Sequence, residues 1–182
     1  MAQLIKMIGI FSFSLLPLVA CDGHAATGSQ STYASDGITF NYPANWKIVK
    51  DEKNKFVHLI FVDSPQTAGF SITTSPKSSA ESLSDYATDH SRRVAITMAS
   101  SKINKPTLVT TATPAGTVIT EKFTLHPDDD PINFIHEYRL VKSKQRVAHL
   151  VSKMPEDELE NTAAGFALIL KTFTLTDVDQ AK

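Results

Sequence analysis

The 182-residue chain contains a single cysteine, Cys21, which limits how its fold can be stabilised. An intramolecular disulfide needs two cysteines, so any domain in this chain must be held together by its hydrophobic core. Roughly 160 residues follow Cys21, and a domain of that size buries about 70% of the surface that its unfolded chain exposes. The sequence therefore predicts one domain that is large enough to fold without cross-links.

The residues before Cys21 have the pattern of an export signal. Lys6 supplies a positive charge, and the apolar run over residues 7–18 is shorter than the roughly 20 residues that a membrane-spanning helix needs. The run leads into Leu18-Val19-Ala20-Cys21, which resembles the lipobox of bacterial lipoproteins. This resemblance implies cleavage after residue 20, attachment of a diacylglyceryl group to the Cys21 sulfur and acylation of the new amino terminus. A non-lipidated cleavage near Ala25-Ala26 is the alternative, but it leaves Cys21 without a role.

The residues after the lipobox predict where the domain is held. Asp22 resembles the residue that retains lipoproteins at the inner membrane of enteric-type bacteria, facing the periplasm, rather than at the outer membrane. The following segment is poor in aliphatic side chains and rich in Gly, Ser, Thr and Ala, which predicts a flexible tether. We therefore divide the chain into a signal peptide (1–20), an acylated cysteine with its tether (21–35), a single domain (36–176) and a tail (177–182).

The charge of the chain argues against a nucleic-acid partner. The chain has 18 basic and 19 acidic residues, a formal net charge of −1, and removal of Lys6 with the signal peptide lowers this by one more unit. Neutralising nucleic-acid phosphates requires a basic stripe, which this balance does not supply. The predicted partners are the membrane, through the lipid anchor, and an envelope protein.

Hydrophobic periodicity after residue 36 predicts two groups of strands, each followed by a helix. A capping-box spacing at Ser78-Ser79-Ala80-Glu81 predicts the start of the first helix, whose apolar stripe includes Leu83, Tyr86, Ala87, His90 and Val94. Pro155 and three acidic residues predict the start of the second helix. Its predicted apolar face consists of Leu159, Ala163, Phe166, Leu170 and Phe173. This order favours an α+β domain in which helices pack on an antiparallel sheet. The predicted strands are residues 38–42, 46–49, 58–62, 70–74, 108–112, 117–125, 132–142 and 145–152.

Short motifs also suggest a family. The segment from Gly37 to Trp46, GITFNYPANW, looks like the opening strand of the PsbP-like superfamily. The lipobox followed by Asp22, the Pro155-Glu156-Asp157 helix start and the closing Phe173-Thr174-Leu175 are similar to the DcrB-like bacterial lipoproteins. The resemblance implies an α/β/α sandwich around an antiparallel sheet, in periplasmic or lumenal accessory proteins that share no catalytic set. No active-site residue can therefore be carried over.

Common catalytic motifs are absent from the sequence. It contains no Gly-x-Ser-x-Gly nucleophile elbow and no His-Glu-x-x-His metal-binding helix. It also lacks the phosphate-binding loops Gly-x-Gly-x-x-Gly and Walker A. Lipidation would also remove Cys21 as a nucleophile. We therefore expect a protein that is not an enzyme, and no motif predicts a cofactor.

The most suggestive polar residues lie on the last three long strands. A turn at Ser143-Lys144 would place Tyr138 opposite His149, and pairing Leu125 with Ile132 would place Glu121 opposite His136. One sheet face could then carry Glu121, His136, Tyr138 and His149, and two imidazoles with a carboxylate are an acceptable zinc set. The same face carries Ile119, Phe123, Phe134 and Val151. We therefore favour hydrogen-bonded residues at the edge of the core over a metal site formed by Glu121, His136 and His149.

Three other features have simple structural interpretations. Asp128-Asp129-Asp130 lacks the spacing of a preformed calcium loop and predicts a solvated hairpin tip. His90 is interpreted as a satisfied, partly buried histidine of the first helix, and Trp46 as a core residue beside Pro43.

Two classes of function remain after these exclusions. The favoured class is a non-catalytic envelope lipoprotein that binds a protein partner and supports envelope maintenance, assembly or uptake. The alternative is a lipoprotein that binds a small ligand or a metal. An exposed apolar patch would favour the first class, and a closed pocket with convergent polar groups would favour the second.

Overall fold

The structure is a computed structural model, and it describes residues 29–98, 102–126 and 130–177. The predicted signal peptide, the proposed lipidation residue Cys21, the sorting residue Asp22 and most of the predicted Asp128-Asp129-Asp130 tip lie outside the described residues.

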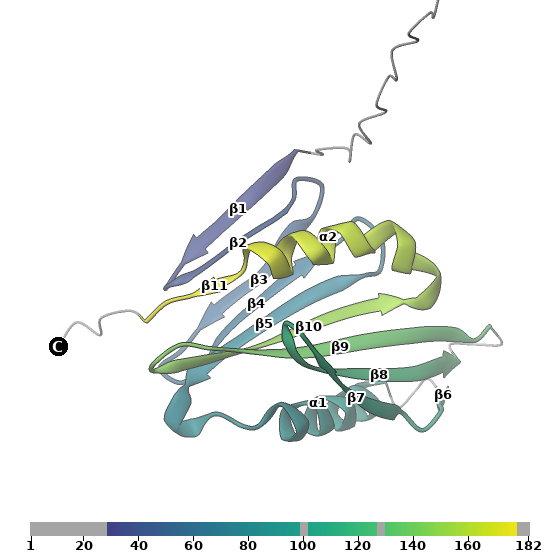
Figure 1. Ribbon diagram of the computed structural model, residues 1–182. Helices are drawn as coiled ribbons and strands as arrows, with labels where there is room; N and C mark the ends of the chain where they lie inside the picture. The colour runs from purple at the N-terminus through teal and green to yellow at the C-terminus, as the bar shows by residue number, and fades with distance from the viewer. Residues whose placement is uncertain (1–28, 99–101, 127–129, 178–182) are drawn as a thin grey trace, which may run out of the picture.

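Within these ranges the chain forms two groups of strands, each followed by a helix, as the periodicity predicts (Figure 1). Short 3-10 turns at Lys77–Ser79 and Glu156–Glu158 precede the helices. The helices are α1 (Leu83–Thr97) and α2 (Leu159–Thr172). The strands are β1 (Gln30–Ser35), β2 (Ile38–Pro43), β3 (Lys47–Lys53), β4 (His58–Asp63), β5 (Gly69–Pro76), β6 (Lys102–Ile103), β7 (Thr107–Thr113), β8 (Gly116–His126), β9 (Ile132–Lys142), β10 (Arg146–Pro155) and β11 (Thr174–Leu175).

The strands form two antiparallel sheets. The large sheet has the order β3-β4-β5-β10-β9-β8-β6, with β7 also paired to β8, and the small sheet has the order β1-β2-β11. Figure 1 shows α1 on one face of the large sheet and α2 on the opposite face, where α2 lies beside the small sheet. The predicted α+β fold, with an antiparallel sheet packed by helices, is confirmed. No helix in the described ranges is long and apolar enough to cross a membrane.

The first strand corrects the predicted boundary of the tether. Residues 30–35 form β1 and pair with β2, so the folded domain begins before residue 36. Tyr33 explains the difference, because its ring stacks on Phe40 at 5.0 Å and its hydroxyl donates to Asp51 over 2.9 Å. One aromatic side chain therefore orders a segment whose composition is otherwise typical of a linker.

The larger core lies between α2 and the sheet. Phe166 of α2 is buried, and its ring meets Trp46 at 5.2 Å edge-on and Phe70 at 6.1 Å. Ile169, one turn further along α2, is fully buried in the same cluster. The core positions of Phe166 and Trp46 are confirmed, but Leu159 and Ala163, which were also predicted on the apolar face, are exposed. The buried face of α2 is formed instead by Thr162, Gly165, Phe166 and Ile169.

Both helices start later than predicted. Ser82, and not Ser78, caps α1, because its hydroxyl accepts the N–H of Asp85 and donates to the Asp85 carboxylate. Glu81 stays outside the helix since its carbonyl accepts a hydrogen bond from His149. The acidic residues after Pro155 form a single 3-10 turn, in which Glu158 accepts the N–H groups of residues 67 and 68.

Candidate functional site

A buried polar cluster lies between α1 and the large sheet. The register between β8 and β9 places the two central residues of this cluster opposite each other. Glu121 of β8 pairs with His136 of β9, as predicted from the pairing of Leu125 with Ile132. Both side chains point to the face that α1 covers, with Ile119 of β8 and Tyr138 of β9. Glu121 has no exposed surface, and His136 is 4% exposed.

The predicted pairing of Tyr138 with His149 is wrong by two residues. Tyr138 pairs with Val151, and His149 pairs with Leu140. The turn between β9 and β10 lies one residue later than predicted, because Ser143 bonds to Arg146 through both backbone and side chain. The carboxylate of Asp177, beyond β11, accepts bonds from Ser143 and from the Gln145 N–H and so ties down this turn.

His149 therefore lies on the predicted face but outside the cluster. Its ring stacks on Tyr86 of α1 with centroids 4.0 Å apart and a 6° interplanar angle. Its Nε2 donates to the carbonyl oxygen of Glu81 over 3.3 Å. Burial lowers the pKa of His149, and the bond to Glu81 only partly opposes this. The residue holds the start of α1 against β10 and is not placed to share a ligand with Glu121.

His90 of α1 completes the cluster in its place. Its Nδ1 lies 3.0 Å from the Tyr138 hydroxyl, and its ring centre is 5.5 Å from that of His136. Donor atoms of His90, Glu121 and His136 all lie within 4.8 Å of one another. The sequence placed His90 on the buried stripe of α1, but periodicity alone does not reveal which strand residues a helix will cover. We call His90, Glu121, His136 and Tyr138 the buried polar cluster.

The hydrogen bonds of this cluster converge on one carboxylate oxygen. Oε2 of Glu121 accepts the Nδ1–H of His136 over 3.0 Å and a short bond from the Tyr138 hydroxyl. The network then assigns the Nδ1–H of His90 as the donor to the Tyr138 oxygen. The second oxygen of Glu121, Oε1, is buried and has no hydrogen-bond partner. A buried oxygen in that state costs free energy unless a ligand satisfies it.

The surroundings of the cluster favour neutral imidazoles and a charged carboxylate. Burial lowers the pKa of His90 to about 3, assisted by the charge of Lys153, and burial also lowers the pKa of His136. Burial opposes ionisation of Glu121, but the bond from His136, then Ser91 and Tyr138, outweigh it and lower the pKa of this carboxyl. The Ser91 hydroxyl lies near the Glu121 carboxylate but does not form a hydrogen bond with Oε1.

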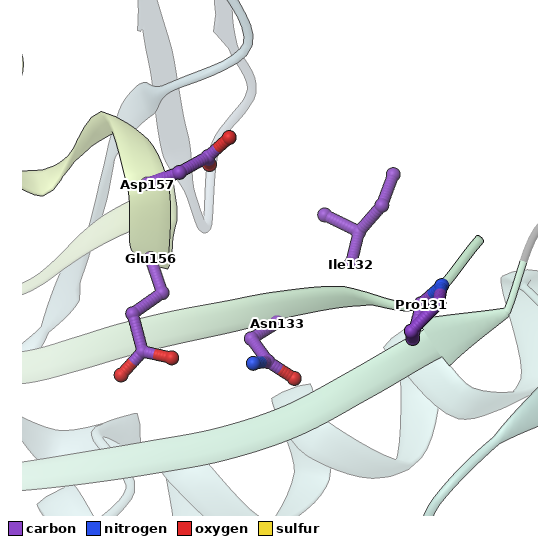
Figure 2. Close-up of a pocket in the computed structure, with 5 residues that line it drawn as sticks. All are labelled: Pro131, Ile132, Asn133, Glu156 and Asp157. Atoms are coloured by element: carbon purple, nitrogen blue, oxygen red, sulfur yellow. The ribbon is translucent and has the colours of Figure 1, made fainter.

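A separate surface depression lies beside the first residues of β9. Figure 2 shows its lining residues, Pro131, Ile132, Asn133, Glu156 and Asp157, with the two carboxylates pointing apart. Glu156 is also paired with Lys122, whose Nζ lies 3.3 Å from its carboxylate. These side chains do not converge on a common point, so the buried polar cluster is the stronger candidate site.

Neither a protein-family model nor a curated protein sequence matches the chain. Solved structures resemble its fold.

One of these structures is the cyanobacterial PsbP, CyanoP, from Synechocystis sp. PCC 6803, with 19% identity, a TM-score of 0.49, and coverage of 88% of this chain and 99% of that chain. A mutant of the protein Mog1 has 8% identity and a TM-score of 0.47, with 82% and 97% covered. LpqN of Mycobacterium tuberculosis, a protein involved in cell envelope biogenesis, has 13% identity and a TM-score of 0.38, with 84% and 87% covered. Likenesses at this level assign no function to the chain.

The chemistry of the cluster is that of a binding or structural centre. It supplies one buried carboxylate, two imidazoles and a phenol, a set that can hold a cation or a proton. The cluster lies one strand inside the edge of the sheet, since Leu108 of the edge strand β7 pairs with Glu121.

Proposed function

We propose that the protein is a lipid-anchored, non-catalytic envelope domain that binds an extended segment of a partner protein along the free edge of β7. The observation that carries this proposal is the contrast between the two edges of the large sheet. The β3 edge carries five charged side chains among seven residues, and the β7 edge, Thr-Leu-Val-Thr-Thr-Ala-Thr, carries none.

Charged side chains on an edge strand prevent another chain from adding to the sheet. The lysines of β3 provide this protection at one end of the sheet. Within the described residues β7 pairs only with β8, which leaves its other edge free. Leu108 and Val109 of this strand are 39% and 54% exposed. The β7 edge is therefore open to a further strand.

An added strand fits this edge chemically. Main-chain hydrogen bonds supply the affinity in this mode of recognition, and alternate side chains supply the specificity. Threonine and valine favour extended backbone, and the exposed apolar groups of β7 can be covered by a partner strand. The partner we infer is a different envelope protein with an extended segment of few charges.

Anchoring at Cys21 would hold this edge near a membrane. Residues 22–29 separate the cysteine from β1, and a fully extended segment of that length spans at most about 29 Å. Several acyl chains make a stable anchor where one is marginal. The lipobox and Asp22 support a location at the inner membrane, facing the periplasm, and the resemblance to DcrB-like lipoproteins supports an accessory role.

A photo-crosslinking residue at Thr111 tests the β7 edge in native membranes. We expect one specific adduct with another envelope protein, identified by mass spectrometry, and its loss when Val109→Lys places a charge on the edge. The matched control is Val49→Lys on β3, because Val49 and Val109 are 55% and 54% exposed. An adduct that persists in the Val109→Lys protein, or one that joins two copies of this chain, contradicts the proposal.

Labelling with an acyl-chain probe tests the anchor. Cys21→Ala should remove the label and block lipoprotein-type cleavage, because the chain has no second cysteine to receive the lipid. Label that remains on this variant rules out the lipidation assignment.

Membrane fractionation tests the sorting role of Asp22. We expect the protein in the inner membrane, and Asp22→Ser should move it to the outer membrane. A protein found in the outer membrane both before and after the change contradicts the assignment.

A further inference from the structure

We infer that His90, Glu121 and His136 form a binding site for one divalent transition-metal ion of the zinc type, which joins α1 to the strands β8 and β9. The site goes beyond the protein-binding role and does not depend on it. It also differs from the set predicted from sequence, because His90 replaces His149.

The donors come from three separate elements and meet in a buried place. His90 extends from α1, Glu121 from β8 and His136 from β9, with their donor atoms within 4.8 Å of one another. Two imidazoles and a carboxylate form a set that zinc accepts, and imidazole favours zinc-type ions over calcium or magnesium. Zinc holds such donors at roughly 2.0–2.2 Å, so the outer donors would draw together on binding. Each imidazole must bind through an unprotonated nitrogen, so coordination through Nδ1 would replace the hydrogen bond that this atom donates in the structure. His90, on α1, is the least buried of the three ligands.

The negative charge of the Glu121 carboxylate favours binding of a cation in the cluster. Within the described residues the only ion-pair partner of Glu121 is His136, and no lysine or arginine reaches its carboxylate. The Glu121 side chain is fully buried, so water does not solvate its carboxylate. Buried charges in proteins are normally paired or bound to metal. A divalent ion would supply the missing positive charge.

The unpartnered oxygen of Glu121 is the second, independent observation. Oε1 is buried without a hydrogen-bond partner, and Oε2 already accepts bonds from His136 and Tyr138. Coordination through Oε1 would satisfy the free oxygen. It would also let Tyr138 keep its bond to Oε2, and hydrogen bonds of this kind orient metal-ligating carboxylates in known sites.

A metal at this position would fasten a helix with few other attachments to the sheet. In the smaller core, α1 contributes Tyr86 and Ala87 as buried residues, with Leu83 partly buried beside them. The side chain of His90 lies one turn beyond Tyr86, toward the end of the helix. A metal–ligand bond there would hold the second half of α1 against β8 and β9.

Metal titration of the full-length protein in detergent micelles tests the site. The protein is purified with a tag that contains no histidine, stripped with a chelator and titrated with Zn²⁺ by calorimetry, with Co²⁺ absorption as a second readout. We expect one ion per chain, a higher melting temperature with Zn²⁺, and an intense visible Co²⁺ band typical of four-coordinate sites. A ligand that prefers the folded state stabilises it by mass action.

Three variants separate the site from other histidines. His90→Gln and Glu121→Gln should each weaken Zn²⁺ binding on the order of 100-fold or more, since even outer-shell partners of a metal contribute 10–100-fold. His149→Gln is the control, because His149 is a buried histidine on the same sheet face but lies outside the cluster. It should bind Zn²⁺ like the natural protein. His90 is only half-buried, so its variant should fold even if the Glu121 variant does not.

Several results would overturn the site. These are the absence of one-to-one binding in the natural protein, unchanged affinity in a folded His90→Gln protein, or equal loss of affinity in folded His149→Gln. Val109→Lys distinguishes this inference from the β7 proposal. Val109 pairs with Thr120 on the opposite face from Glu121, so this variant should lose the partner and keep the metal.

Discussion

Gly165 lies on α2 at the point where the helix crosses Trp46. A Cβ atom at this position would meet Cζ2 of Trp46 at 2.6 Å and Cγ of Pro43 at 3.1 Å. Glycine in a helix interior costs about 1 kcal/mol relative to alanine, so the helix gives up intrinsic stability here. Close packing of the helix on the indole ring accounts for that loss.

We expect Gly165→Ala to destabilise the protein by about 1–2 kcal/mol. Overpacking against the buried indole costs about 1–3 kcal/mol, and the better helix propensity of alanine recovers up to about 1 kcal/mol. Urea denaturation followed by circular dichroism measures the change. Ala163→Gly, at an exposed position of the same helix, is the control and should cost about 1 kcal/mol by propensity alone. A Gly165→Ala protein more stable than the natural one would mean that the ring moves away freely.

At the level of single residues, sequence reasoning placed three of the four residues of the buried polar cluster, Glu121, His136 and Tyr138, on one sheet face. Glu121 and His136 follow from strand pairing, which depends on a short loop and on alternation that can be read locally. His149 was misplaced because a one-residue shift of the turn moves the pairing by two positions. The shift depends on Asp177, more than 30 residues away along the chain, which no local pattern can reveal.

Among the elements, α2 contributes Phe166 and Ile169 to the larger core, and Phe166 is the larger of these two side chains. Phe166→Ala should destabilise the protein by about 3–5 kcal/mol, because the side chain is 5% exposed and packs between Trp46 and Phe70. Such a loss is a large part of the roughly 5–15 kcal/mol typical of a domain. Chemical denaturation measures it.

Phe56 provides the matched control for this change. It lies in the loop between β3 and β4 and is 61% exposed, so Phe56→Ala should change the free energy of unfolding by less than about 0.5 kcal/mol. Equal losses in the two variants would show that α2 does not dock as described.

The elements themselves were largely predictable, but their ends were not. Alternation and the i, i+3, i+4 pattern predict the strands and helices because burial imposes these periods. Two serine-x-x-acid sequences, at Ser78 and Ser82, offer equivalent caps for α1. The choice between them is made by the bond from His149 to the Glu81 carbonyl, which is a tertiary contact.

For the molecule as a whole, buried histidines should make the fold sensitive to acid. The folded-state pKa of His149 is lowered by burial, and an unfolded histidine titrates near about 6.5. The unfolded chain therefore binds more protons than the folded protein below that pH. Stability that is fully present above about pH 6.5 should decline as the pH falls toward the folded-state pKa.

Melting temperatures of the metal-free protein between about pH 7.5 and pH 5 test this prediction. They should fall more steeply for the natural protein than for His149→Gln, in which one buried titrating group has been removed. Parallel curves for the two proteins would show that His149 is not responsible for the acid sensitivity.

The joining of the two strand groups into one sheet was beyond sequence reasoning. β5 pairs with β10, although α1 and the four strands β6 to β9 lie between them in the chain, and this contact joins the two meanders into one continuous sheet. Local periodicity predicts neighbours along the chain, and it contains no information on which distant strand completes a sheet. The unprotected β7 edge became visible only once that order was known.

The small sheet can be completed only after the C-terminal strand β11 is available, so it is completed late in folding. β11 pairs with β2, and the N–H of Asn41 donates to the hydroxyl of Thr172, a residue 131 positions later. A chain that emerges from a ribosome or threads through a translocation pore exposes β2 long before its partner arrives. Contacts this distant in sequence form slowly and late. The domain therefore stays incomplete until the end of α2 and β11 have emerged.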